Sequence, residues 1–374
     1  MPRSFIRRAA KKIFILANII TALFFLAGAN VSYFDPEQYW FIGLLTLVLP
    51  YILVILIFFL FLWGFTLRIW FLIPLITIAF SWKAIINIFP LHFSPAFNMQ
   101  KKANTFRVMN WNVEHFDILE YKTRPETKQK MMDLVKEYQP DVACFQEMVG
   151  GDDDAAINYL GDFKRFMGFS EYYYSYENRF NFDRVHHFGI ITFSKYPILN
   201  KQTISIPPHD YNSTFQYVDL LVGADTIRVF NIHLQSLKFS QTNREYLDKP
   251  TMSDSAVSES KNIISKLKRG FLKRTVQANK IRETVEQSPF PVIVCGDFND
   301  VPNSYAYNNI GKGLQDAFLE KGLGFGRTFS GISPTLRIDN IFIDKRFTVD
   351  QFIRIDKKLS DHFPIISDVI FNPK

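Results

Sequence analysis

Eight polar residues after residue 104 each follow or interrupt a short hydrophobic run of the kind that forms a buried strand. They are Asn112, Glu147, His233, Asp297, Asn299, Asp339, Asp361 and His362. Burying an unpaired carboxylate or imidazole is costly, so we expect these side chains to pair with one another or to share a metal ion. Carboxylates and amides dominate the set, and such oxygen donors suit Mg²⁺ or Mn²⁺ better than zinc.

The elements that position these residues are predicted from the same hydrophobic runs. Short apolar or alternating runs that end in polar residues are expected for buried strands whose ends face a cleft. Strand ends that meet along one edge of a sandwich would bring the polar residues together. The predicted strands cover residues 106–113, 141–147, 187–194, 226–234, 292–298 and 337–343.

Two helices are predicted between these strands. The segment 125–138 places Met131, Leu134 and Val135 on one face, and Pro140 ends it. A second helix is predicted over 261–287, ending before Pro289 and Pro291. Arg274 and Gln277 lie one turn apart on that helix, and we favour a pair on its surface over an arginine that reaches toward the cleft.

Charge divides the chain at about residue 104. The first 104 residues contain nine basic and two acidic residues, whereas the remaining 270 are balanced at 34 of each sign. The sequence pI of about 9.1 therefore belongs to the N-terminal part and does not indicate a basic nucleic-acid-binding surface on the rest. The composition also excludes a wholly soluble protein, a disordered chain and a disulfide scaffold.

The N-terminal part, residues 1–100, is predicted to cross a membrane with three helices, at about 13–34, 40–62 and 69–89. Lys83 interrupts the third, which could instead be re-entrant. The basic residues before the first span place the N-terminus in the cytoplasm. Three crossings then put the rest of the chain outside, so we predict an integral membrane protein with an extracytoplasmic domain. Without the third crossing, that domain would be cytosolic.

Two cysteines and two polar segments complete the organisation. Cys144 and Cys295 lie in apolar, β-branched runs, where a free cysteine packs as a small hydrophobe, and we favour this over a bridge between them. Residues 148–156 are predicted to form a solvated acidic loop rather than a cation site. Residues 238–260 are predicted to leave the domain near the cleft, as a lid or an insertion.

The motifs around the eight polar residues resemble a known family in order and spacing. They read WNV at Asn112, FQE at Glu147, NIHLQS at His233, GDFND at Asp297 and Asn299, RIDNIF at Asp339, and SDH at Asp361 and His362. Together they resemble the endonuclease/exonuclease/phosphatase superfamily, which includes deoxyribonuclease I, inositol polyphosphate 5-phosphatases and neutral sphingomyelinases. The resemblance covers residues 105–371. It implies that residues 105–374 form an α/β domain, a four-layered α/β sandwich with two mixed sheets flanked by helices.

The resemblance also implies a metal-dependent enzyme that cleaves phosphoester bonds. Glu147 is expected to be the principal magnesium ligand, with Asn112 and Asp361 completing or orienting its shell. His362 is expected to pair with Asp339 and to polarise the attacking water or contact the scissile phosphate.

The remaining roles concern the nucleophile and the leaving group. Asp297, held with Asn299, would orient or deprotonate water, and His233 would donate to a phosphate oxygen or to the leaving group. The alternative is a membrane-tethered binding module of the same fold without catalysis, against which the complete residue set argues.

The expected partners are a phosphodiester substrate and the lipid bilayer, with no protein partner predicted. The substrate is a nucleic acid or a phospholipid headgroup or other small phosphodiester, and the sequence leaves these open.

Overall fold

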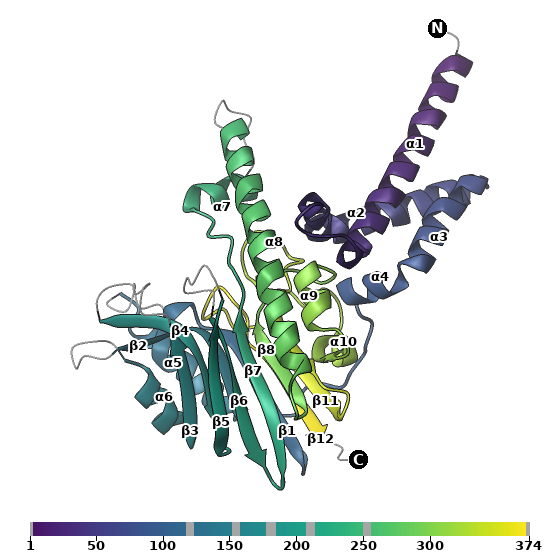
Figure 1. The fold of residues 1–374 in the computed structure, drawn as a ribbon. Helices are drawn as coiled ribbons and strands as arrows, with labels where there is room; N and C mark the ends of the chain where they lie inside the picture. The colour runs from purple at the N-terminus through teal and green to yellow at the C-terminus, as the bar shows by residue number, and fades with distance from the viewer. Residues whose placement is uncertain are drawn as a thin grey trace.

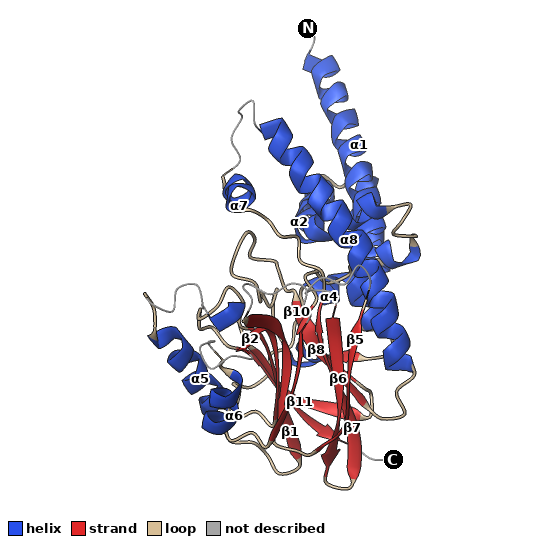
Figure 2. Ribbon diagram, turned by 60° about the vertical axis from the view of Figure 1, so that its left-hand side comes forward, coloured by secondary structure: helices blue, strands red, loops and turns tan. Residues whose placement is uncertain are grey.

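The computed structural model describes residues 3–116, 123–151, 158–176, 185–206, 214–249 and 256–371. An N-terminal group of apolar helices stands beside a globular domain built on two β-sheets (Figure 1, Figure 2). The first helix, α1, points away from the sheets, and the long helix α8 runs between the sheets and the apolar helices (Figure 1).

The first sheet has the strand order β11-β12-β1-β2-β4-β3. Its strands β1 and β2 are parallel, and its other neighbouring strands are antiparallel. The strands are β1 (Thr105–Asn112), β2 (Val142–Gly151), β3 (Glu171–Tyr176), β4 (His186–Ser194), β11 (Phe347–Arg354) and β12 (Ile365–Phe371).

The second sheet has the order β5-β6-β7-β8-β10-β9 and is also mixed, because β7 and β8 are parallel whereas their neighbours pair antiparallel. The strands are β5 (Ile198–Ser205), β6 (Thr214–Val222), β7 (Asp225–His233), β8 (Val292–Asp297), β9 (Gln315–Asp316) and β10 (Asp339–Ile343).

Successive side chains along each strand point to opposite faces of its sheet, and this creates three hydrophobic layers. Val108 and Val229 belong to a core between the two sheets, whereas the next residues along β1 and β7, Met109 and Phe230, face outward into separate clusters. The helices that cover the outer faces are α5 (Glu126–Tyr138) and α6 (Leu160–Met167) on the first sheet and α8 (Ala256–Glu286) and α9 (Tyr305–Ile310) on the second. The short helix α10 (Ala317–Lys321) instead contributes Ala317 to the core between the sheets. The predicted four-layered sandwich is therefore confirmed. Cys144 and Cys295 are free and buried in the central layer, as predicted.

A polar contact fixes the two sheets relative to each other close to the strand ends. The Asn231 side chain of β7 donates hydrogen bonds to the carbonyl oxygens of Phe145 (3.2 Å) and Ile191 (2.7 Å) in the opposite sheet. Gln146 Nε2 donates to Asn231 Oδ1 at 2.7 Å and to Asn110 Oδ1 at 2.8 Å. Because buried amides need specific partners, this network selects one alignment of the sheets.

The N-terminal helices are apolar over most of their surface. Two segments, Phe5–Ala29 and Trp40–Phe65, are long and apolar enough to cross a membrane, and most of their residues are not buried within the protein. The third predicted span is not one helix, because Ile69–Phe80 and Trp82–Ile88 meet at a 69° bend. The helices are α1 (Arg3–Ala29), α2 (Gly43–Phe65), α3 (Leu72–Phe80) and α4 (Trp82–Ile88), with short 3₁₀ turns η1 (Val31–Tyr33), η2 (Trp40–Ile42) and η3 (Ile69–Phe71).

The bend after α3 turns α4 toward the globular domain (Figure 1). There, α4 forms hydrogen bonds with buried polar groups of the domain. Asn87 Nδ2 donates to Asn303 Oδ1 at 2.8 Å, and Asn303 Nδ2 donates to the carbonyl oxygen of Ala84 at 2.9 Å. Arg337 donates to the carbonyl oxygen of Asn87 at 2.7 Å. These hydrogen bonds make the contact specific. A different packing that kept the same polar groups buried would leave them without hydrogen-bond partners, which is costly.

Candidate active site

Sheet two places three of the predicted residues side by side. His233 of β7 is the register partner of Asp297 in β8, and Asp297 is the register partner of Asp339 in β10. The residues two positions away along each strand, Asn231, Cys295 and Ile341, lie between the sheets. Side chains two apart share a face, so all three functional side chains point into the space at the end of the central layer.

Sheet one contributes Asn112 and Glu147 from the opposite side of that space. Glu147 lies where the pairing of β2 with β4 shifts register, and its φ is +55°. A bulge of this kind changes the direction in which a side chain points. The positive φ is costly for any residue that has a Cβ. Asn112 Nδ2 donates to Glu147 Oε1 at 3.3 Å and to Asp297 Oδ2 at 3.0 Å. The amide therefore joins the two sheets across the site.

Asp339 and His362 form the predicted carboxylate–imidazole pair. Asp339 Oδ2 lies 2.8 Å from His362 Nδ1, and the His362 backbone carbonyl accepts a hydrogen bond from Trp111 Nε1 at 3.0 Å. Burial alone lowers the pKa of His362, but Asp339 and Asp297 outweigh it and raise the pKa well above its ordinary value. With Nδ1 held by Asp339, His362 Nε2 faces Asp297 Oδ2 at 3.7 Å.

Asp297 occupies the middle of the cluster. Its carboxylate accepts hydrogen bonds from the backbone nitrogen of Asn299 at 2.7 Å and from Asn299 Nδ2 at 3.2 Å. His233 Nε2 lies 3.6 Å from Asp297 Oδ2 and 3.7 Å from Glu147 Oε1. Burial is the largest cause of two shifts: it raises the pKa of Asp297 to about 7 and lowers the pKa of His233 to about 4.

Two residues of the site were missed in the sequence, Glu114 and His115. Glu114 Oε2 accepts a hydrogen bond from the backbone nitrogen of Asp361 at 2.8 Å, and His115 Nδ1 lies 3.4 Å from Glu147 Oε2. Both residues have positive φ, 45° and 56°. Burial and the neighbouring Asp361 raise the pKa of Glu114 to about 7. The available signal was their place directly after Asn112 and Val113, at the end of β1.

The structure thus brings all eight predicted residues into one connected cluster, in which Asp361 Oδ1 lies 3.8 Å from His362 Nε2. Among the described residues, the group of acidic and histidine side chains close enough to hold a metal ion is Asp297, Asp339 and His362, whose donor atoms lie within 4.8 Å of one another. This group differs from the predicted ligand set, and a carboxylate and histidine cluster of this kind suits a divalent cation.

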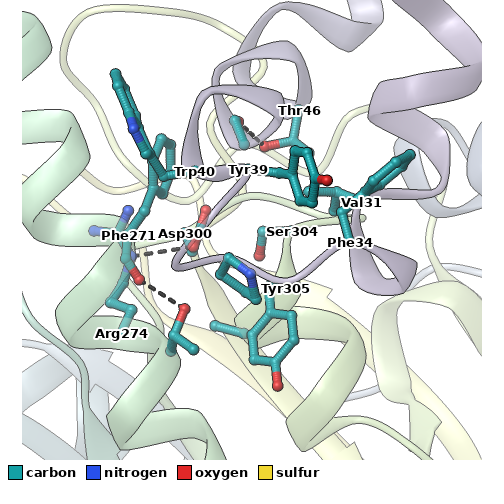
Figure 3. A pocket seen from close by; sticks show the side chains of 14 residues that line it. Val31, Phe34, Tyr39, Trp40, Thr46, Phe271, Arg274, Asp300, Ser304 and Tyr305 are labelled. Carbon is teal, nitrogen blue, oxygen red and sulfur yellow. Dashed lines mark hydrogen bonds and ion pairs between the residues drawn. The ribbon is translucent and has the colours of Figure 1, made fainter.

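Helix α8 fixes the loops that leave the site. Arg274 Nε donates to Asp300 Oδ2 at 3.0 Å (Figure 3), and Gln277 Oε1 accepts from the backbone nitrogen of Gln235 at 2.9 Å. The interpretation of Arg274 and Gln277 as a surface pair is wrong, since both are buried. The physical reason is that α8 packs directly over the residues that follow β7 and β8, whose polar groups need buried partners.

The same face of α8 contacts the connection between α1 and α2. The ring of Phe271 packs against Gly43, where an added Cβ would lie 3.3 Å from the ring, and Lys268 Nζ lies 5.2 Å from the centre of the Trp40 ring. Figure 3 shows Tyr39 and Trp40 on one side of this junction and Phe271, Asp300 and Tyr305 on the other. The loop after Asp297 is therefore held between α8 and the membrane region.

The two polar segments are described in part. Residues 238–260 include a short helix, α7 (Gln241–Asp248), whose Arg244 acts to lower the pKa of Asp361, although burial raises it overall. Residues 250–255 lie outside the described residues. Of the predicted acidic loop 148–156, β2 includes 148–151, and the rest lies outside the described residues.

We compared the chain with models of known protein families and with known proteins. The family model "Endonuclease/Exonuclease/phosphatase family" matches residues 109–362, and a "Domain of unknown function (DUF8431)" matches residues 11–88. No curated protein matches the chain significantly.

Solved structures share the fold at low sequence identity. The endonuclease/exonuclease/phosphatase from Bacteroides vulgatus has a TM-score of 0.53 at 15% identity, covering 71% of this chain and 99% of that chain. The Bacteroides thetaiotaomicron family protein has a TM-score of 0.52 at 16% identity, covering 73% and 100%. Humanized D. rerio TDP2 has a TM-score of 0.50 at 17% identity, covering 71% and 99%. Because the family model spans well over half of the chain, the chain belongs to the endonuclease/exonuclease/phosphatase family and has the fold of its phosphoester hydrolases.

Proposed function

We propose that the chain is a membrane-anchored phosphodiesterase that depends on a divalent metal ion and hydrolyses phosphoester bonds by in-line attack of an activated water. The observation that carries this proposal is the position of the Asp297 carboxylate. It is held by Asn112 and Asn299 and is flanked by His233 and His362 at the end of both sheets. A carboxylate fixed in this way orients a water molecule and accepts its proton.

The other side chains are assigned to the phosphate. His362, with Nδ1 held by Asp339, presents Nε2 toward Asp297 and would contact the scissile phosphate or polarise the water. His233 lies between Asp297 and Glu147 and would donate to a non-bridging oxygen or to the leaving group. Both imidazoles are buried, so their positions are fixed before the substrate arrives.

Glu147 is proposed as the principal metal ligand, with Asn112 and Asp361 completing the shell. Glu114, Glu147 and Asp361 gather at this end of the cluster, and no lysine or arginine within the described ranges forms an ion pair with them. A divalent cation would offset their mutual repulsion, and their oxygen atoms favour Mg²⁺ or Mn²⁺. When bound, the ion supplies charge neutralisation for the phosphate and the departing oxygen.

The substrate proposed on these grounds is a phosphodiester at the membrane, such as a phospholipid headgroup or another small phosphodiester. The domain after residue 104 has equal numbers of acidic and basic residues, whereas binding to nucleic acid is dominated by basic contacts to phosphate. The helices α1 and α2 hold the site beside the bilayer, which raises the local concentration of headgroups. A nucleic acid substrate is the second candidate, and a substrate panel separates the two.

We infer further that the N-terminus is cytoplasmic and the catalytic domain extracytoplasmic. Five basic residues precede the apolar part of α1, whereas the connection from Asp35 to Glu37 carries acidic charge. Trp40 of η2 and Gly43 at the start of α2 follow that connection directly and contact α8 of the catalytic domain, which supports a common side of the membrane for the connection and the domain. The bent pair α3 and α4 then returns the chain to that side.

The proposed activity is tested with the full chain in detergent and bis-p-nitrophenyl phosphate. We expect hydrolysis with Mg²⁺ or Mn²⁺, and its loss with EDTA. Glu147→Gln and His362→Ala should each reduce kcat/KM by at least about 100-fold, since each removes a group that acts on the transition state. Lys130→Gln, an exposed change on α5, is the matched control. Full activity in EDTA would exclude the metal mechanism.

A further inference from the structure

A cavity lies between the N-terminal helices and the catalytic domain. Its volume is about 550 Å³, within the usual range for small-ligand sites. Ser32 and Tyr33 beside α1 and Lys83 and Asn87 of α4 line one side, and residues between 305 and 316 line much of the other. None of the eight proposed active-site residues lines it, so this is a separate site.

The charge in this cavity is positive. Lys83, Lys312 and Lys345 line it, all three are exposed, and no ion pair or hydrogen bond of their ammonium groups occurs among the described residues. The one carboxylate in the lining, Asp316, is buried and lies 2.6 Å from Arg337 Nη1, which neutralises it. Three lysines without carboxylate partners around one cavity are the arrangement expected for binding an anion.

The position of Lys83 relates the cavity to the bilayer. Lys83 is the one charged residue between Ile69 and Phe89, and it lies just after the bend that separates α3 from α4. The neighbouring Phe80 and Trp82 are 85% and 57% exposed, and Tyr33 at the end of η1 is 86% exposed. Exposed aromatic side chains beside a lysine are typical of the boundary between hydrocarbon and headgroups.

We propose that this cavity binds the phosphate-bearing headgroup of an anionic phospholipid from the membrane that α1 and α2 cross. The three lysines would contact the phosphate, and the acyl chains would lie against the apolar surface around Phe80 and Trp82. A bilayer lipid is the occupant because one wall of the cavity belongs to the membrane region, where headgroups are concentrated. Binding at this site does not depend on the proposed hydrolase activity.

The test is native mass spectrometry of the detergent-solubilised full chain, titrated with phosphatidylglycerol or with phosphatidylcholine. EDTA is present, so that lipid binding is measured separately from hydrolysis. We expect phosphatidylglycerol to bind with the higher affinity. The double variant Lys312→Gln/Lys345→Gln should weaken that binding by roughly tenfold or more, because two of the three cations are lost. Lys83→Gln should weaken it as well.

The matched control is Lys130→Gln/Lys136→Gln, which removes the same charge from α5, on the opposite flank of the domain (Figure 1). This variant should bind phosphatidylglycerol as the unmodified chain does. Equal binding of the two lipids, or unchanged phosphatidylglycerol binding by Lys312→Gln/Lys345→Gln, would overturn the proposal. Competition by inorganic phosphate at an affinity equal to that of the lipid would show a site for soluble anions and would overturn it too.

Discussion

At the scale of single residues, Asp339 and His362 each compensate the free-energy cost of burying the other. Asp339 Oδ2 contacts His362 Nδ1 at 2.8 Å, whereas Asp339 Oδ1 is buried without a hydrogen-bond partner among the described residues. A buried carboxylate with one free oxygen is expensive unless an opposite charge compensates it. His362 provides that charge, and the contact with Asp339 fixes the ring orientation that directs Nε2 toward Asp297.

This reciprocity predicts the effect of Asp339→Asn. The amide is nearly isosteric but neutral, so it no longer favours the imidazolium form of His362. We expect kcat for bis-p-nitrophenyl phosphate to fall by about 10²–10⁴-fold with little change in KM, the range for loss of acid–base function. Asp350→Asn, which makes the same chemical change at an exposed ion pair with Lys102, should leave kcat unchanged. A kcat for Asp339→Asn close to that of the unmodified enzyme would rule out this role.

The same residues show which parts of the site the sequence could predict. His233, Asp297 and Asp339 were predictable because each lies at the polar end of an apolar strand, and the register of sheet two then makes them neighbours. Glu114 and His115 could not be predicted, because positive φ angles direct the chain into the site there and no residue pattern in the sequence indicates them. The raised pKa of Asp297 also depends on complete burial, which only the assembled sandwich provides.

At the scale of elements, burial separates what the sequence predicts from what it does not. The central strands β1, β2, β7 and β8 are apolar and buried, so their positions follow from hydrophobic runs. The edge strand β5 is mostly exposed, and it forms because β6 offers hydrogen bonds to it. For the third apolar stretch, the sequence left a straight span and a re-entrant segment open, since hydropathy does not reveal that Asn87 must meet Asn303.

The junction of α4 with the domain predicts a stability change. Arg337 is buried and joins Asp316, at 2.6 Å, to the carbonyl oxygen of Asn87. Arg337→Met leaves the Asp316 carboxylate buried without its counter-ion, and we expect a loss of about 3–5 kcal/mol. The measurement is thermal unfolding of the full chain in detergent. Asp316→Asn/Arg337→Met should recover much of the loss, and a double variant no more stable than Arg337→Met would contradict this account.

At the scale of the whole molecule, the apolar helices and the globular domain contact each other at more than one place. The connection between α1 and α2 packs against α8, and α4 packs against Asn303 and Arg337, so the catalytic domain touches the membrane region at two separate places. Figure 2 shows α8 running from the sheets up alongside the apolar helices. With the proposed membrane spans, the loop after Asp297 that these contacts hold would stay close to the bilayer surface.

This arrangement predicts that residues of the α1–α2 connection and of the catalytic domain are accessible from the same side of the membrane. Cys144 and Cys295 are buried, so single cysteines placed at exposed Glu37 and Lys358 are expected to be the reactive thiols. In intact cells, a membrane-impermeant maleimide should label Glu37→Cys and Lys358→Cys, whereas Ser4→Cys should react only after permeabilisation, as the positive-inside rule requires. Labelling of Glu37→Cys but not of Lys358→Cys in intact cells would place the domain across the membrane from the connection, and would contradict both the topology and the packing against α8.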